Sequence, residues 1–368
     1  MRPKEHPELI FDVIPKLYEE HFKVFVTHLG NVQEQLHVLP RKFCRMYTTR
    51  PLANQLLKYL ESRQAKIGEE DFQVVEECKP FPLRLSDGKR LEAMLCSGSE
   101  LGHNLILLIR RPTNAGKLLY CYSAARLENL GCLLANSVFN SWISQGTEQL
   151  YLNLSDVNRP FEHVDFDVLA ATIEEYRKEH NQVVLLKLPL FGYEELVYQL
   201  DNTRLHGHIR LVGNFLESFK CLSSDLKPIP ERVIKVHVCD THNWRTVASR
   251  ELKEELIATV NFPLDLLKWS PQPTRMHLRQ LCSLVRPQHI QGIVPFHSSG
   301  NVPPAPQFLQ CFRSTYVAAS KAKEPPSKAQ ETQPNQRVEK RKTKAPLRVI
   351  NAKRHHFVDD ENDSSNSN

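Results

Sequence analysis

Apolar residues form short runs along the first half of the chain, each about the length of one β-strand. Polar, Gly or Pro residues separate the runs, and β-branched and aromatic residues are frequent within them. The runs read FKVFVTHL, CRMYTT, FQVVEE, RLEAMLC, NLILLIR, KLLYCYS and LYLNL. This part of the chain is therefore predicted to build a large β-sheet system.

Helical spacing first appears in TTRPLANQLLKYLESR, where Thr48 or Thr49 is placed to cap a helix and Pro51 lies in its first turn. After residue 160 helices and strands alternate, which favours a parallel βαβ-type sheet. The alternating segments are DFDVLAATIEEYRKEH, QVVLLKLP, GYEELVYQL, HIRLVG, VIKVHVCD, LIATVNF, TRMHLRQLCSLV and HIQGIVPF. The Pro-rich NVPPAPQ is expected to end the folded region near residue 300, with FLQCFRSTYV as one further helix.

Composition limits the class of protein. With 368 residues and 41% hydrophobic residues, the chain can bury one large domain or two medium ones. Nine cysteines without a C-x-x-C pair, and an N-terminus without an apolar leader, indicate an intracellular protein with reduced thiols. The longest apolar run, NLILLI, is far below the roughly 20 residues of a membrane span, so no membrane partner is expected. No phosphate-binding glycine loop appears, and no small-molecule substrate is evident.

The net charge of +6 is concentrated near the C-terminus. Residues 320–354 carry eleven Lys or Arg against three Glu, whereas residues 355–368 carry four acids and no Lys or Arg. Because this segment lacks apolar periodicity, residues 301–368 are expected to form a basic disordered tail. Its densest cluster, at Lys340, Arg341, Lys342 and Lys344, is typical of a nuclear-localisation signal or a phosphate-contacting arm. The alternative is a tail that only increases solubility.

The order of these segments resembles the metallo-β-lactamase/β-CASP nucleases of DNA cross-link repair, the Apollo- and Artemis-like family. The closing segment supports this resemblance most strongly. Its sequence, WSPQPTRMHLRQLCSLVRP, follows the family's strand, S-D-H-S-S-x-x-E-L loop and helix without a gap. The resemblance implies an α/β fold, a metallo-β-lactamase-like αββα sandwich with an inserted β-CASP domain. The implied parts are an N-terminal segment (1–21), the first part of the lactamase-like domain (22–155), the insertion (156–258), the closing part (259–300) and the tail (301–368).

In that family, loops at strand ends supply the ligands of one or two zinc ions. The H-x-H-x-D-H loop corresponds to FVTHLGNVQ, which keeps only the first histidine. The other motifs correspond to CSGSELGHN, to GKLLYCYS in place of Gly-x-x-Leu-Tyr-x-Gly-Asp, to LYLNLSD and to the Pro-Gln of the closing segment. The resemblance thus places the former metal site at His28, Gly30, Val32, Gln33, Ser99, Ser123, Asn153 and Gln272.

Zinc requires about three or four nitrogen, sulfur or carboxylate donors, and only His28 offers a strong one. We therefore expect no bound metal, no cofactor and no catalytic residue, although active relatives use zinc. Three alternatives remain: His103 as a replacement ligand, the pair His206 and His208, and the cluster of Cys239, Asp240 and His242 in HVCDTH.

The functional expectation is a nuclear pseudo-nuclease of DNA cross-link repair or telomere protection, which binds DNA ends or repair and telomere proteins. Two alternatives are an active metal-dependent 5′-3′ DNA exonuclease and a non-catalytic β-CASP subunit of an RNA 3′-end processing complex. Nucleic-acid contacts in the folded region are expected at Arg41, Lys42, Arg45, Arg110 and Arg111, which could equally form an ordinary solvated surface.

Overall fold

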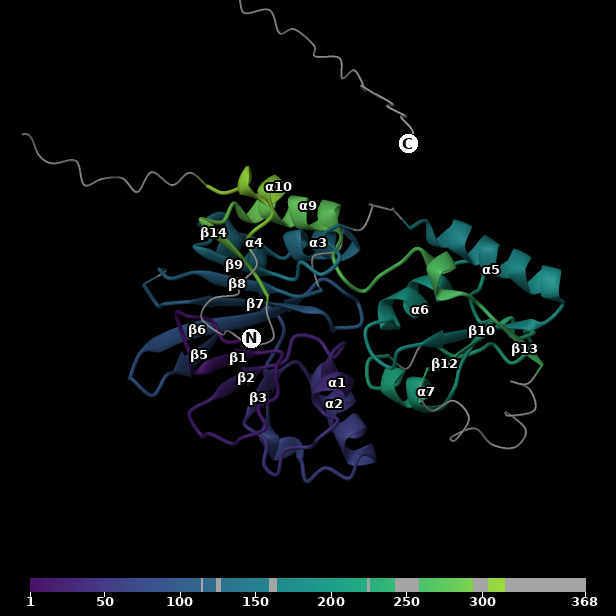
Figure 1. Cartoon of the computed structure of the whole chain (residues 1–368), viewed down its shortest axis with the longest axis horizontal. Coiled ribbons are helices and arrows are strands. Elements are labelled where there is room, and N and C mark those ends of the chain that lie inside the picture. The colour runs from purple at the N-terminus through teal and green to yellow at the C-terminus, as the bar shows by residue number, and fades with distance from the viewer. Residues whose placement is uncertain are drawn as a thin grey trace, which may run out of the picture. The chain divides into compact units, whose positions relative to one another are not determined.

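The computed structural model describes residues 1–113, 115–123, 127–158, 164–223, 226–241, 258–293 and 304–314 (Figure 1). By its contacts the chain divides into residues 1–316 and residues 317–368, and every described residue belongs to the first unit. The predictions at His242, Lys340, Arg341, Lys342 and Lys344 lie outside the described residues.

The first sheet has four parallel strands in the order β1-β2-β3-β4. They are β1 (Leu9–Phe11), β2 (Lys23–Phe25), β3 (Met46–Thr48) and β4 (Phe72–Val74). The segment 1–21, predicted as a separate N-terminal part, therefore supplies a strand of this sheet. The short helix α1 (Val32–Gln35) follows β2, and α2 (Arg50–Ser62) follows β3.

The predicted helix after the second Thr of TTRP is confirmed as α2, with Pro51 in its first turn. Thr49 occupies the N-cap position in extended conformation, but its hydroxyl makes no capping hydrogen bond. It donates instead to the carbonyl oxygen of Gly102 at 3.2 Å, so this threonine ties the start of α2 to a neighbouring loop.

The second sheet has six strands in the order β14-β9-β8-β7-β6-β5. β5 to β8 pair antiparallel, whereas β8, β9 and β14 pair parallel. The strands are β5 (Phe81–Arg84), β6 (Arg90–Ser97), β7 (Leu105–Arg110), β8 (Leu118–Cys121), β9 (Gln149–Leu152) and β14 (His289–Gly292).

Alternate residues of this second sheet belong to two different cores. In β7, Leu105, Leu107 and Ile109 join the core shared with the first sheet. Ile106 and Leu108 join the core on the opposite face, under α3 (Leu127–Ala135), α4 (Ser137–Ser144) and α9 (Arg275–Val285). Side chains alternate between faces along a strand, and both faces of β7 are buried, which explains why residues 105–109 (LILLI) are all apolar.

The two sheets pack face to face, with helices outside them (Figure 1). Between the sheets, the ring centroid of Phe11 in β1 lies 5.0 Å from that of Tyr120 in β8. The layers are α2, the first sheet, the second sheet, and the group α3, α4 and α9. The fold is thus mixed α/β, as predicted, with four layers in the αββα order.

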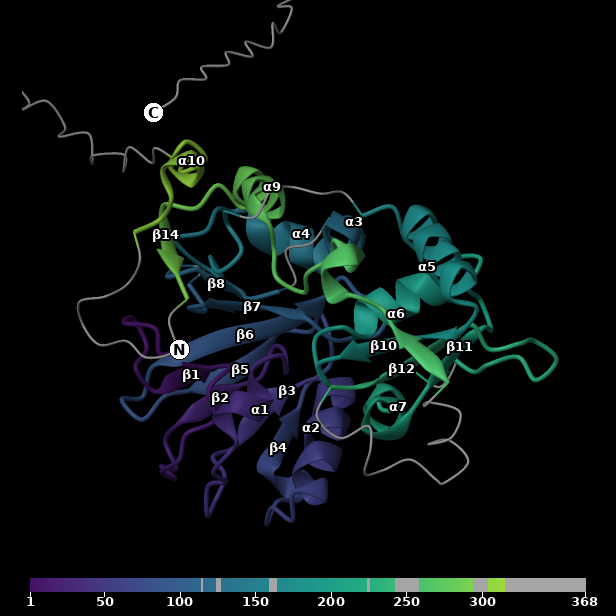
Figure 2. The same ribbon diagram turned by 45° about the vertical axis from the view of Figure 1, so that its right-hand side comes forward.

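A third sheet is built between β9 and β14 in the sequence (Figure 2). Its four parallel strands have the order β11-β12-β10-β13, which confirms the parallel arrangement predicted from the alternation. The strands are β10 (Val183–Leu188), β11 (Ile209–Leu211), β12 (Val236–Asp240) and β13 (Thr259–Asn261), the last just past the boundary predicted at residue 258. Helices α5 (Phe166–His180) and α6 (Glu194–Asp201) lie on one face, and α7 (Gly213–Phe219) on the other.

Buried polar contacts tie this inserted sheet to the sandwich. Gln55 of α2 donates from Nε2 to Oε1 of Glu194 at 2.8 Å and to the hydroxyl of Ser218 at 2.7 Å. Ser99 donates to Oε2 of Glu195 at 2.5 Å. Both glutamates lie in the first turn of α6, where the positive end of the helix dipole stabilises a carboxylate. The insertion is therefore anchored through the N-terminus of one helix.

The closing helix α9 begins at Thr274, whose backbone N–H donates to Nδ1 of His277 at 3.0 Å. The predicted extra helix is present only as one turn, α10 (Gln307–Gln310). No helix in the described ranges is long and apolar enough to cross a bilayer.

Candidate functional site

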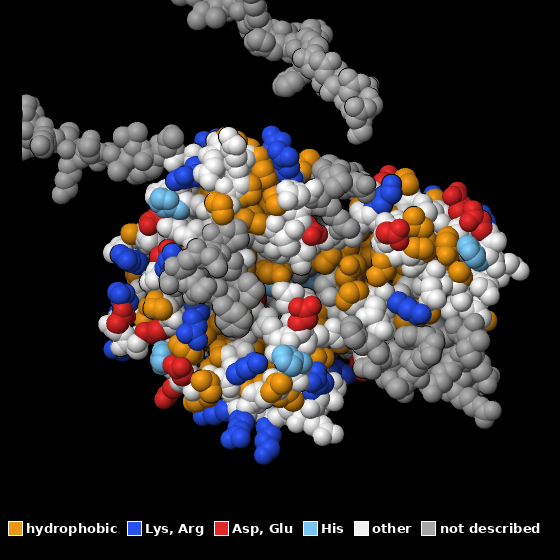
Figure 3. Space-filling view, in the orientation of Figure 1, with side chains coloured by type: hydrophobic (Ala, Val, Ile, Leu, Met, Phe, Trp, Pro, Cys, Tyr) orange, Lys and Arg blue, Asp and Glu red, His pale blue; other side chains and the backbone are white. Residues whose placement is uncertain are grey.

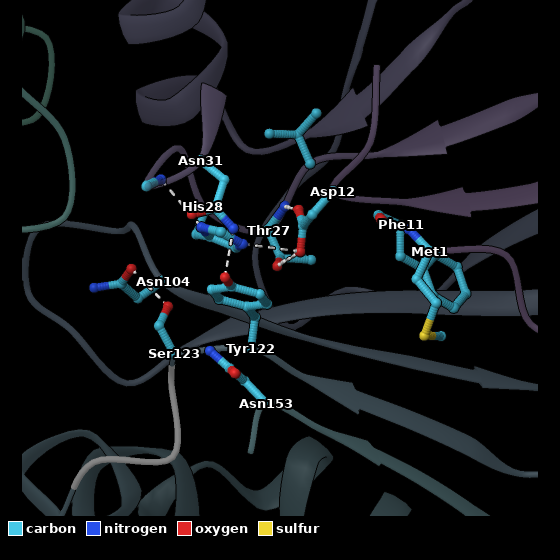
Figure 4. Close-up of polar contacts among 12 residues, drawn as sticks. Met1, Phe11, Asp12, Thr27, His28, Asn31, Asn104, Tyr122, Ser123 and Asn153 are labelled. Carbon is cyan, nitrogen blue, oxygen red and sulfur yellow. Dashed lines mark hydrogen bonds and ion pairs between the residues drawn. The ribbon is translucent and has the colours of Figure 1, made fainter. Parts of the chain in front are cut away.

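Strand ends from both sheets of the sandwich meet at one edge (Figure 4). Asp12 follows β1, His28 is the third residue after β2, Ser123 follows β8 and Asn153 follows β9. Asn104 immediately precedes β7, which runs in the opposite direction. The N–H of Leu105 donates to the carbonyl oxygen of Thr27 at 2.8 Å, which joins the two sheets here.

His28 lies buried at this edge as a neutral imidazole. Its Nδ1 accepts the backbone N–H of Gly30 at 3.1 Å, so the ring proton belongs on Nε2. Nε2 lies 3.5 Å from Oδ2 of Asp12. Burial lowers the pKa of His28 below its ordinary value and outweighs the nearby Asp12 carboxylate, which raises it. The histidine that the resemblance retains is thus enclosed by protein groups.

Asp12 is an acid of this site that the sequence analysis did not identify. Its carboxylate accepts the backbone N–H of Thr27 at Oδ1 and the Thr27 hydroxyl at Oδ2, both at 2.6 Å. It adopts a positive φ of 50°, a conformation that Asp tolerates better than most residues. The available signal was the short apolar run LIFD, which places an acid directly after a strand.

Tyr122 is the second residue that the sequence analysis missed. Its ring stacks on the His28 imidazole, with centroids 3.7 Å apart and an interplanar angle of 14°. Its hydroxyl oxygen accepts the side-chain N–H of Asn31 at 2.5 Å. Burial raises the pKa of Tyr122, so the phenol is neutral. In the pattern Gly-x-x-Leu-Tyr-x-Gly-Asp this tyrosine stands at the second glycine, which is the signal that could have revealed it.

Neutral side chains satisfy one another where the family would hold charged ligands. The hydroxyl of Ser123 donates to Oδ1 of Asn104 at 2.9 Å. The side-chain N–H of Asn153 donates to Oε1 of Gln272, and Oδ1 of Asn153 accepts the backbone N–H of Ser155 at 3.0 Å. Ser123 and Asn153 are buried, so their polar atoms depend on these partners.

Only some of the positions predicted for the former metal site lie together in the structure. It brings together His28, Ser123, Asn153 and Gln272, with Gly30 contributing its N–H. Val32 is a buried residue of α1 that belongs to the core between the sheets. Gln33 lines a groove beside the site.

Ser99 is linked to the site only indirectly. Its hydroxyl lies 3.4 Å from Nδ1 of His103, and Nε2 of His103 lies 3.2 Å from the Asn104 amide nitrogen. The main partner of Ser99 is Glu195 of the insertion. His103, considered as a replacement ligand, therefore takes part in a chain of hydrogen bonds with Ser99 and Asn104.

The donors at this edge do not fit a zinc ion. Among the residues that the structure describes, no group of three or more His, Cys, Asp or Glu is placed to hold a metal. The imidazole of His28 is covered by Tyr122, and the Asp12 carboxylate accepts two hydrogen bonds from Thr27. The remaining side chains are amides and hydroxyls. Such groups are weak zinc ligands, so no hydrolytic step can be derived from a metal here.

A groove of about 890 Å³ lies beside the site, between the sandwich and the insertion. Gly30 and Gln33 line one side, and residues of α2, α7 and the loop after β10 line the rest. Its charges are mixed, because Lys58 pairs with Glu217 across it. Arg63 is turned back onto its own helix, where NH1 donates to the Tyr59 hydroxyl at 3.0 Å.

The five basic candidates of the folded region lie away from this edge. Arg41, Lys42 and Arg45 are exposed and precede β3, and the carbonyl oxygen of Arg45 accepts the N–H of Val24 at the start of β2. They therefore lie at the opposite end of the first sheet from His28. Lys42 places its ammonium 3.6 Å from the ring centroid of Tyr18.

Arg110 and Arg111 end β7, at the opposite end of that strand from Asn104. Arg110 donates from Nε to Glu92 at 2.7 Å and stacks 4.0 Å from the Trp142 ring, so its charge already has a local partner. Arg111 is exposed.

The two other candidate metal clusters of the sequence, the histidine pair and the described part of the HVCDTH segment, contact neighbouring protein groups or lie buried. His206 lies 3.1 Å from the carboxylate of Asp201, and His208 contacts the carbonyl oxygen of Val233 at 2.7 Å. Cys239 and Asp240 are buried at the end of β12, and burial raises the pKa of Cys239 to about 12.

No protein-family model matches the chain, and no curated protein matches it. Among solved structures, Zn²⁺-bound PqqB from Methylobacterium extorquens is similar, at 13% sequence identity over 65% of this chain and 70% of that chain. The TM-score is 0.24, a likeness too low to carry an argument about the site. The chain is a four-layer α/β sandwich with a parallel α/β insertion. Its strand ends form a site of hydrogen-bonded side chains.

Proposed function

We propose that this chain is a non-catalytic relative of the metallo-β-lactamase/β-CASP nucleases, a nuclear protein of DNA repair or telomere protection. It would bind DNA ends, or the repair and telomere proteins assembled on them, without cutting the strand. The support is the order of segments that the sequence shares with that family, together with a parallel α/β insertion between β9 and β14.

One observation carries the non-catalytic part of the proposal. Four positions that the resemblance assigns to metal ligands lie together, and their side chains contact each other or neighbouring protein groups. A hydrolase of this kind needs a metal to lower the pKa of water from about 15.7 to about 7. Among the described residues, no three strong donors surround His28, and its Nδ1 is already occupied by the N–H of Gly30.

The experiment combines three measurements on the full chain. Elemental analysis is expected to find no stoichiometric zinc, and DNA with a labelled 5′ end is expected to remain intact with Mg²⁺, Mn²⁺ or Zn²⁺ added. The same DNA should bind saturably, as judged by fluorescence anisotropy. About one zinc per chain, together with 5′ exonuclease activity that EDTA abolishes, would establish the active-nuclease alternative instead. Absence of DNA binding, with co-purification of an active β-CASP subunit, would favour the RNA-processing alternative.

A further inference from the structure

Four arginines form one exposed surface on the outer helical layer of the sandwich. Arg275, Arg279 and Arg286 belong to α9 or follow it directly, and Arg313 follows α10. We call these four residues the arginine face. Figure 3 shows Lys and Arg side chains over α9 and α10.

The arginine face has no acidic counterpart in its own segments. Residues 266–293 and 304–314 contain no Asp or Glu. In the described part of the chain, none of the four arginines forms an ion pair with an acid. The positive potential of the face is therefore not neutralised locally.

Aromatic rings and backbone groups hold these guanidinium groups in place. Arg275 lies 4.4 Å from the ring centroid of Phe308, and Arg279 lies 6.0 Å from that of Phe312. Arg313 donates from Nε to the carbonyl oxygen of Gln288 at 2.6 Å. A guanidinium that stacks through its flat face keeps its N–H groups at its edge, where they can donate to phosphate oxygens.

The spacing suits a regular chain of phosphates. Arg275 and Arg279 are about one helical turn apart, and Arg286 follows Arg275 by eleven positions, or about 16 Å along the helix axis. About five successive phosphates of one B-DNA strand cover that axial distance. The sequence also leads directly from Arg313 into the basic segment 320–354.

We propose that the arginine face binds the phosphodiester backbone of nucleic acid, separately from the strand-end site and its groove. This assignment rests on the proposed nucleic-acid-binding function and gives it a location. The groove suits a polyanion less well, because its Lys58 is paired with Glu217. Arg110, one of the candidates from the sequence, is likewise paired with Glu92. The arginine face would contact phosphates and not bases, so duplex DNA and duplex RNA are both expected ligands. The test therefore compares the two duplexes.

The test measures how the affinity of the full chain for duplex DNA and for duplex RNA depends on salt. The variant Arg275→Gln/Arg279→Gln/Arg286→Gln removes three cations, and Lys66→Gln/Arg84→Gln/Arg90→Gln removes three exposed cations from other parts of the sandwich. Each phosphate contact contributes about 0.9 to the slope of log affinity against log salt for B-DNA. The first variant should lower that slope by two to three units, and the matched control should leave it unchanged.

Two further variants separate charge from folding. Arg275→Lys/Arg279→Lys/Arg286→Lys keeps the three charges and should keep most of the slope, although it loses the stacked guanidinium groups. The single change Arg286→Gln disturbs neither stacked arginine and should lower the slope by about one unit. It keeps the inference testable if the triple Gln variant does not fold.

The outcomes distinguish this inference from the proposed function. DNA binding with an unchanged slope in both Gln variants of α9 would overturn the arginine face and leave the proposed function standing. A wild-type chain that binds neither duplex would overturn both. Equal binding of poly-glutamate and duplex DNA, with equal sensitivity to the α9 changes, would mean that the face binds acidic protein.

Discussion

The phenol ring of Tyr122 lies flat on the imidazole of His28, at a centroid separation of 3.7 Å and an interplanar angle of 14°, and covers one face of that ring. Tyr122→Ala should remove both this stack and the hydroxyl that accepts from Asn31. We expect a loss of about 2 to 4 kcal/mol in the free energy of unfolding, whereas Tyr122→Phe keeps the ring and should cost about 1 kcal/mol. Urea unfolding followed by fluorescence measures both. Equal costs for the two variants would show that the ring does not stabilise the site.

Buried His28 should make stability depend on pH. Burial lowers its pKa in the folded state, so below about pH 6.5 the unfolded chain takes up a proton that the folded chain does not. The free energy of unfolding therefore falls as the pH drops from about 6.5 to the folded pKa, by at most about 1.4 kcal/mol per pH unit. His28→Asn keeps an acceptor for the Gly30 N–H and should flatten this part of the profile.

The comparison for that experiment is His6, another buried histidine whose pKa burial lowers. His6→Asn should remove a separate part of the pH dependence, and the double variant should be flatter than either single one. Parallel profiles of the wild type and His28→Asn between pH 5 and pH 8 would rule out the linkage.

Chelation should leave the fold unchanged. A ligand stabilises a protein only if the folded state binds it, and among the described residues no group of three or more His, Cys, Asp or Glu is placed to hold a metal. The melting temperature measured by scanning fluorimetry should be the same with EDTA, without it, and with added Zn²⁺. A melting temperature that rises with zinc and then saturates would be evidence for a site.

The buried hydrogen bonds of Gln55, which link α2 to α6, should contribute more to the free energy of unfolding than the half-exposed ion pair between Lys58 and Glu217. Gln55→Ala leaves the buried Glu194 carboxylate and the Ser218 hydroxyl without their shared donor, so we expect a loss of about 2 to 3 kcal/mol. Lys58→Ala removes a half-exposed pair with Glu217 and should cost under about 1 kcal/mol. Chemical denaturation compares the two, and similar costs would contradict the ranking.

The cluster in the basic segment remains a sequence prediction. Changing Lys340, Arg341, Lys342 and Lys344 to Ala should move a fluorescently tagged chain from the nucleus into the cytoplasm, because the cluster concentrates four cations within five residues. The matched control changes four scattered cations of the same segment, Lys321, Lys323, Lys328 and Arg337. Equal distributions of the two variants would show that the cluster is not a localisation signal.

The strands of the sandwich could be predicted because their patterns are strong. Residues 105–109 (LILLI) are apolar at successive positions since both faces of β7 are buried, and this run covers all of the strand except its last residue. The parallel insertion could be predicted for a similar reason, because helical and strand periods alternate over residues 166–261. The meeting of Asn153 and Gln272 was expected only from the family resemblance.

The features that could not be predicted, namely β1 and the site residues Asp12 and Tyr122, depend on contacts between distant segments. β1 has three residues, too few for a period, and its place is fixed by pairing with β2 and by the Phe11–Tyr120 contact across the layers. Asp12 could not be assigned to the site without that placement. Tyr122 follows a recognisable strand, but a sequence does not show that its ring turns onto His28 rather than into solvent.

The Asn153–Gln272 hydrogen bond also bears on how such a site could change in evolution. Asn153 is buried, and a histidine ring or a shorter Asp at position 272 would not keep an acceptor at the place of the Gln272 side-chain oxygen before any metal could compensate. Each ligand introduced singly would therefore lower stability, and a gain would come only after several had been introduced together. The effects of such substitutions on stability are therefore not additive. Because every single-substitution intermediate would be less stable, the neutral site tends to persist.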